Sequence, residues 1–184
     1  MNLKKIKDSF VRFEKSFPFY RMHIHNFRSQ IINLGKNKVS IEELSNRFEG
    51  AMWRDHLKEG SELEGLLKTL PGCKDGLIDV QSILILGLLW CGGDNEDKAL
   101  ALFELVNPVG QNQESISAGD KEWESVFDTI VYVATYFTYT NAKTKFGDSV
   151  MSEYTKITGL QALYFEQLSQ RSIAVMRDSD NDTH

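Results

Sequence analysis

A short pattern recurs three times along this chain at almost constant spacing. Val39, Ile78 and Ile116 are β-branched residues that each precede a polar residue in a loop, and the steps between them are 39 and 38 residues. The segments between these loops carry apolar residues at helical spacing, whereas strand patterns are confined to very short pieces. A repeat of this length indicates a repeated supersecondary unit. We therefore expect an all-α chain built from helix–loop–helix units.

The sequence marks where these helices begin and end. Ser61 and Asp94 are expected N-caps, while Pro18 and Pro71 interrupt helical patterns. After an N-terminal helix, the expected helices cover residues 20–33, 41–57, 62–70, 80–90, 95–107, 121–140 and 149–176.

The second of the three loops, "PGCKDGLIDVQS" at residues 71–82, has a recognisable skeleton. Gly76 is followed two residues later by Ile78, and then by Asp79 before a long apolar helix pattern. This skeleton and the repeat spacing resemble those of the EF-hand. An EF-hand consists of a helix, a 12-residue loop and a second helix. The stretch "LGLLWCGGDNEDKALALFELVN" at 86–107 is similar to the connection between the second and third hands of the calcineurin-B and neuronal-calcium-sensor branch.

The resemblance covers about residues 20–137 and implies two EF-hand-like lobes. Residues 20–92 would hold hands one and two, and residues 93–176 hand three and a very degenerate hand four. A basic amphipathic helix at 1–19 precedes them and a polar tail at 177–184 follows. In this family a glycine shapes the loop and β-branched residues of paired loops bridge each other. The resemblance thus assigns loop-shaping roles to Val39, Gly76, Ile78 and Ile116.

The loops depart from the family in their ligands. Calcium takes about 6–8 oxygen ligands, but the ligand types that remain are only Glu43 in the first loop and Asp75 and Asp79 in the second. Lys36 stands at a ligand position of the first loop, and the second opens on a proline and closes on Ser82. The third loop carries two extra residues, and no register gives the fourth a full ligand set. We expect no metal and no other cofactor, with calcium binding through unusual ligands as the alternative.

Several large apolar residues follow the loops, and two readings stay open for them. They either pack in the core or line a groove that holds an amphipathic helix of a protein partner. The candidate groove residues are Trp53, Leu84, Leu88, Trp90, Trp123 and Phe127.

The N-terminal segment also leaves alternatives open. Ile6, Phe10, Phe13 and Phe17 form one helical stripe in a segment with a basic bias. The helix either docks on the core, contacts a membrane surface or a partner, or serves as a mitochondrial presequence, although its two acidic residues argue against the last.

Bulk properties restrict the function. A net charge of −5 argues against a nucleic-acid partner, and two cysteines, Cys73 and Cys91, favour a reducing compartment. The longest apolar run, residues 83–91, is shorter than the roughly 20 residues of a membrane span. We expect an intracellular protein, cytoplasmic or cytoskeleton-associated, with a mitochondrial location as the alternative.

No catalytic motif or metal-ligand spacing is present in the sequence, and His23, His25 and His56 are interpreted as surface or boundary histidines. We therefore expect no enzyme. The first hypothesis is a non-catalytic adaptor or subunit of a larger assembly that binds a partner helix without calcium. The second is a calcium-responsive sensor with weak sites, and the third is an enzyme on an unrelated helical fold.

Overall fold

The computed structural model describes residues 8, 11–107, 121–137 and 141. Within them the chain is mostly helical and has one sheet of two short strands, which confirms the helical fold class. The elements are the 3₁₀ turn η1 (Pro18–Arg21), α2 (Ile24–Ile32), β1 (Lys38–Ser40), α3 (Ile41–Arg47), α4 (Ala51–Leu57), α5 (Glu62–Leu67), β2 (Leu77–Asp79), α6 (Val80–Trp90), α7 (Asn95–Val106), α8 (Lys121–Tyr132) and the π-helical turn η2 (Val133–Phe137).

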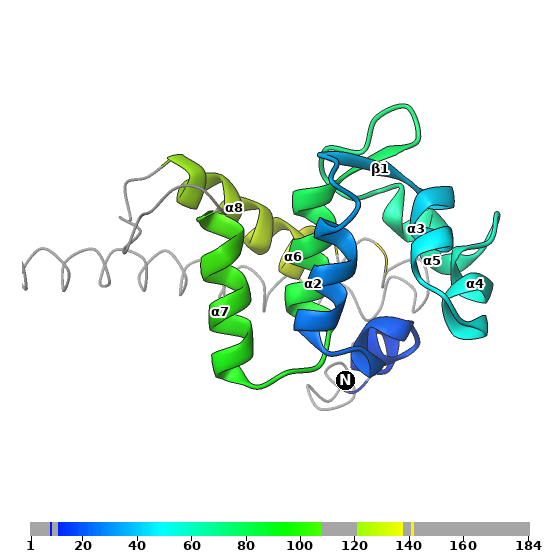
Figure 1. The fold of residues 1–184 in the computed structure, drawn as a ribbon, viewed down its shortest axis with the longest axis horizontal. Coiled ribbons are helices and arrows are strands. Elements are labelled where there is room, and N and C mark those ends of the chain that lie inside the picture. The colour runs from blue at the N-terminus through cyan, green and yellow to red at the C-terminus, as the bar shows by residue number, and fades with distance from the viewer. Residues whose placement is uncertain (1–7, 9–10, 108–120, 138–140, 142–184) are drawn as a thin grey trace, which may run out of the picture.

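The sheet joins the first two of the three repeated loops. β1 and β2 are antiparallel, and Val39 lies opposite Ile78 at the centre of the pairing. Both side chains are fully buried. The Val80 N–H donates to the Asn37 carbonyl at 3.0 Å and extends the contact beyond the strands. The pairing therefore links β-branched residues that are 39 positions apart in the sequence, as the resemblance implies for paired loops, and β1 lies at the top of the view in Figure 1.

α6 is the central helix of the fold. It is apolar on nearly all sides, and it packs against α2, α7 and α8 (Figure 1). Its approach to α2 is close because Gly87 faces the Phe27 ring: a Cβ at position 87 would lie 2.3 Å from Cε1 of that ring. α6 thus lies inside one hydrophobic cluster, whose members run from Phe13 to Phe137.

Side-chain caps define several helix starts. Ser40 at α3 and Asp94 at α7 each form a reciprocal capping box. Ser61 Oγ accepts the Glu64 N–H at the start of α5, as its capping pattern predicts. α6 and α7 begin and end within one residue of their predicted limits.

The prediction of a single helix over residues 41–57 is wrong. The chain forms α3 and α4 instead, and Gly50 between them has a φ of 131°, which an α-helix does not contain. The Phe48 N–H still bonds to the Leu44 carbonyl, and the Phe48 ring then stacks on Trp53 at 4.2 Å between centroids. Met52 is 38% exposed, whereas the neighbouring Trp53 is buried.

The helix predicted over residues 20–33 begins four residues late, at Ile24. The backbone before it is engaged elsewhere: the Gly92 N–H bonds to the Met22 carbonyl at 2.9 Å, and the Ile24 N–H bonds to the Gly92 carbonyl at 2.8 Å. Residue 23 accordingly forms a parallel bridge to residue 92. These tertiary bonds hold residues 22 and 23 extended, so that the helix starts only after them.

The N-terminal segment docks on the core. Phe13 and Phe17 are each 1% exposed, which favours core docking among the alternatives for this segment. Ile6 and Phe10 lie outside the described residues. α7, which begins the second of the two expected lobes, packs against α2 and α6 of the first.

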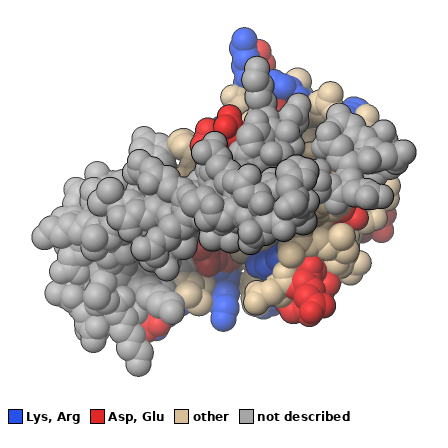
Figure 2. Space-filling model, turned by 90° about the vertical axis from the view of Figure 1, so that its left-hand side faces the viewer, with Lys and Arg blue, Asp and Glu red and all other residues tan. Residues whose placement is uncertain are grey.

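Other expectations also fall outside the described residues. They concern Ile116 and the third loop, the fourth loop, the helix at 149–176 and the tail at 177–184. Among the helices that the structure describes, none is long and apolar enough to cross a membrane. Figure 2 shows one face of the molecule, on which the visible described residues include both acidic and basic side chains.

Candidate functional site

The first paired loop, residues 32–43, is bridged by its own side chains. The Lys36 ammonium contacts Glu43 Oε1, and the Ser40 N–H donates to Glu43 Oε2 at 2.8 Å. The hydrogen bond from Lys36, followed by that from the Ser40 backbone, lowers the pKa of the Glu43 carboxyl below its ordinary value. The one carboxylate expected to remain as a ligand type in this loop therefore has a cation of the same chain beside it.

The second paired loop, residues 71–82, is closed by a hydrogen bond between its ends. The buried Ser82 hydroxyl donates to the Pro71 carbonyl at 2.7 Å. At the tip, the Lys74 N–H bonds to the Leu77 carbonyl at 2.9 Å and the Leu77 N–H bonds back at 3.0 Å. This loop is thus a tight turn whose first and last residues are joined directly.

Positive backbone angles make that turn possible. Asp75 and Gly76 at its centre have φ values of 54° and 76°, as in the mirror-image turns that favour an aspartate–glycine pair. Gly72 also has a positive φ, and a Cβ there would lie 2.9 Å from the Cβ of Asp79. The close packing of residues 72 and 79 leaves no room for a side chain at the first of them.

The structure separates the three remaining ligand types. Glu43 pairs with Lys36, Asp75 lies at the exposed tip of the turn, and Asp79 Oδ1 accepts the N–H groups of Gln81 and Ser82 to cap α6. In the described part of the chain, no group of three or more His, Cys, Asp or Glu side chains is arranged to hold a metal ion. Each of the three carboxylates is therefore placed by its own local structure.

The six candidate groove residues lie in three places. Trp53 and Trp90 are buried on either side of Phe19, whose ring centroid is 5.1 Å from the first and 5.8 Å from the second. Trp123 and Phe127 are half-buried neighbours on α8, with centroids 6.0 Å apart.

Leu84 and Leu88 of α6 form the third place. They line a small pocket with residues of α2 and α7, namely Ile24, Arg28, Ala101 and Leu105. The ion pair between Arg28 and Glu104, 2.7 Å long, also joins α2 to α7. Leu84 and Leu88 are thus the candidate groove residues that lie between packed helices. The helix that covers them is α7 of the same chain.

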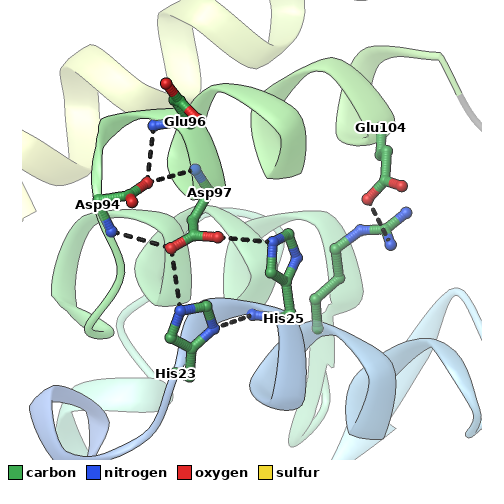
Figure 3. Close-up of polar contacts among 7 residues, drawn as sticks. His23, His25, Asp94, Glu96, Asp97 and Glu104 are labelled. Carbon is green, nitrogen blue, oxygen red and sulfur yellow. Dashed lines mark hydrogen bonds and ion pairs between the residues drawn. The ribbon is translucent and has the colours of Figure 1, made fainter.

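A histidine cluster that sequence reasoning missed joins the start of α2 to the start of α7 (Figure 3). His23 Nε2 lies 3.0 Å from Asp97 Oδ2, and His25 Nε2 lies 3.1 Å from Asp97 Oδ1. His23 Nδ1 also accepts the His25 N–H at 3.4 Å, so both nitrogens of the His23 ring have partners. The cluster fixes the N-terminal ends of two helices against each other.

The same carboxylate also caps its own helix. Asp97 Oδ2 accepts the Asp94 N–H at 3.0 Å, and this bond, ahead of the histidine contacts, lowers the pKa of Asp97 below its ordinary value. No spacing rule connects residues 23 and 97, which are 74 positions apart. The capping box at Asp94 is the only signal in the sequence that bears on the placement of Asp97.

Comparison with protein-family models, with curated protein sequences and with solved structures finds no match to this chain.

Proposed function

We propose that this chain is a non-catalytic, EF-hand-like interaction protein, an adaptor or subunit of a larger assembly, that binds a partner helix without needing calcium. The observation that carries the proposal is the Lys36–Glu43 pair inside a loop that is already bridged to its neighbour through Val39 and Ile78. The antiparallel pairing of the two loops and the side-chain cation beside Glu43 support this proposal.

The chemistry of calcium supports this proposal. Calcium takes about 6–8 oxygen ligands and prefers carboxylates and carbonyls. In the first loop an ion would have to displace the Lys36 ammonium, which repels it. In the second loop the Ser82 hydroxyl already bonds to the Pro71 carbonyl. Both loops therefore have internal contacts at positions where an ion-binding loop needs oxygen ligands.

A role in protein binding is supported by apolar side chains that remain at the surface. Leu100 and Phe103 of α7 are 48% and 37% exposed and lie about one turn apart. Exposed apolar groups are common singly, but two on one helical face suit a contact with another protein. The non-catalytic part of the proposal rests on the sequence, which has no catalytic motif. An intracellular setting is proposed from the mild charge and the two cysteines.

A calcium titration of the full chain tests the proposal against the calcium-sensor alternative. The protein is stripped of metal with EDTA and titrated with calcium by calorimetry and by tryptophan fluorescence, which monitors the buried Trp53 and Trp90. We expect no binding heat and no spectral change, while circular dichroism shows a helical fold throughout. Saturable micromolar binding with a change in tryptophan emission would overturn the proposal in favour of a sensor.

A further inference from the structure

Residues 11–19 place three aromatic side chains beside Trp90, namely Phe13, Phe17 and Phe19. The Phe17 ring stacks on the indole with centroids 5.5 Å apart and planes 3° apart. Phe13 meets the same indole edge-on at 6.0 Å. Phe13 and Phe17, four positions apart, also contact each other edge-on at 5.1 Å. The segment thus presents an aromatic pair, at the spacing of one helical face, to a single tryptophan.

The surface that receives this pair comes from three other elements. Trp90 is at the end of α6, His56 of α4 lies 6.3 Å from the Phe17 ring, and Phe137 of η2 lies 6.3 Å from the indole. We call the surface formed by His56, Trp90 and Phe137 the Trp90 site.

The segment is tied to this site by side chains. Its hydrogen bonds at Ser16 and Phe17 are local: the Ser16 N–H and hydroxyl donate to the Phe13 carbonyl, and the Phe17 N–H donates to the Glu14 carbonyl. Backbone pairing with the rest of the fold begins at Met22, whose carbonyl accepts the Gly92 N–H. The segment can therefore leave the Trp90 site and keep these local bonds.

The docked segment also carries an acidic residue, Glu14. Burial raises the pKa of Glu14, and the positive charge of Lys98 on α7 opposes this effect. A desolvated carboxylate costs free energy that its opposite charge offsets only in part. Docking of the segment therefore combines favourable aromatic contacts with an unfavourable, partly buried charge, which suits a contact that can be exchanged.

We propose that the Trp90 site is where the partner helix binds, and that residues 11–19 occupy it in the free protein as an internal ligand. The partner then has the chemistry of the segment it replaces: a helix with two aromatic residues four positions apart and an acidic residue that faces Lys98. This inference rests on the proposed function and names the recognition chemistry of its partner.

Full-length variants and a peptide in trans test the inference. The probe is a fluorescently labelled synthetic peptide of residues 11–19, and its binding is followed by anisotropy in EDTA. Phe17→Ala weakens the internal ligand and frees the site, so we expect it to bind the peptide at least about tenfold more tightly than the wild type, since self-occupancy lowers apparent affinity. A peptide in which Phe13 and Phe17 are replaced by alanine is expected not to bind.

Phe48→Ala is the matched control. It removes an equally buried ring that packs on Trp53 and not on Trp90, so it loosens the core without opening the Trp90 site. We expect it to bind the peptide no better than the wild type. Equal peptide affinity for Phe17→Ala and the wild type would overturn the inference. Binding of Phe17→Ala to anionic vesicles with no peptide binding would also overturn it, because the site would not be a helix site.

Hydrogen exchange of the wild type decides the question if Phe17→Ala does not fold. We expect the amides of Ser16 and Phe17 to exchange through a local opening, faster than the amides of α6. Exchange of both sets only through global unfolding would contradict the inference. A saturable calcium response would overturn the proposed function but leave these exchange and peptide results unchanged, so the two failures are distinguishable.

Discussion

At the scale of single residues, Lys36 and Ser82 take part in contacts that an ion would mediate in a calcium-binding loop. The Lys36 ammonium neutralises the Glu43 carboxylate, and the Ser82 hydroxyl satisfies the Pro71 carbonyl. Buried or half-buried acceptors need partners, and these partners come from within the loops. Both contacts lie within a single loop, so each of the two paired loops has its own internal contact.

The first prediction concerns the Glu43 carboxyl. Lys36→Met removes the largest cause of its lowered pKa, so we expect the pKa of Glu43 to rise toward its ordinary value. Carboxyl-carbon NMR through an acid titration measures this change. Lys38→Met removes an exposed lysine of the neighbouring strand β1 and is the control. An equal shift of the Glu43 pKa in both variants would mean that general charge, and not the contact with Lys36, sets the value.

At the scale of elements, the close approach of α2 and α6 leads to the second prediction. Gly87→Ala places a Cβ against the Phe27 ring and is expected to lower the free energy of unfolding by about 1–3 kcal/mol, although alanine is the better helix former. Gly65→Ala in α5 meets nothing within 4 Å and is expected to raise stability by up to about 1 kcal/mol. Urea unfolding measures both, and the same sign in both variants would contradict this account of the α2–α6 contact.

The strand pairing leads to the third prediction. Ile78→Asp puts a carboxylate at a fully buried position opposite Val39, and we expect it to cost about 3–5 kcal/mol or to unfold the chain. Leu77→Asp, in the same strand but 41% exposed, is expected to be tolerated. Thermal unfolding followed by circular dichroism compares the two. Unchanged stability in Ile78→Asp would show that the paired loops do not support the fold.

The predictability of these elements depends on how local their causes are. The limits of α6 and α7 follow from Asp79 and Asp94, which cap the N–H groups two and three residues ahead, so a short stretch of sequence contains the signal. The pairing of Val39 with Ile78 is what the resemblance implies for two neighbouring loops of the repeat. These features could be predicted because each has a cause in a pattern that a single sequence displays.

Other features depend on tertiary contacts that no local pattern displays. The helical spacing of Ile41, Leu44 and Phe48 does not reveal the break at Gly50, after which Trp53 of α4 stacks on Phe48. The prediction of a groove did not include the packing of Trp90 against Phe17, because both positions are simply apolar in the sequence. The contacts of Asp97 with the histidines likewise require α7 to be docked on α2.

At the scale of the whole molecule, three carboxyl groups lead to a prediction of pH dependence. The pKa values of Glu43 and Asp97 are lowered, so their stabilising contribution is present above the ordinary carboxyl pKa of about 4 and is lost as the pH falls through the lowered values. The contribution of Glu14 to stability changes with pH in the opposite direction. Its pKa is raised, so protonation at falling pH removes a buried charge and adds stability.

The variant Glu14→Gln separates the effect of Glu14 on stability from the opposite effect of Glu43 and Asp97. We expect this variant to be more stable than the wild type at neutral pH, and the difference to disappear as Glu14 becomes protonated in the wild type. Both proteins are then expected to lose stability at lower pH, where Glu43 and Asp97 are protonated. Urea midpoints across the acid range measure this. A constant difference between the two proteins at every pH would contradict the assignment to the Glu14 charge.

The central claim is that the two loops stay paired through contacts of the protein itself. The most direct test is hydrogen exchange at the amides of Val39, Ile78 and Val80, measured once in EDTA and once in millimolar calcium. The account predicts strong and equal protection under both conditions, because Lys36 and Ser82 hold the loops without an ion. Protection that appears only when calcium is added would contradict it.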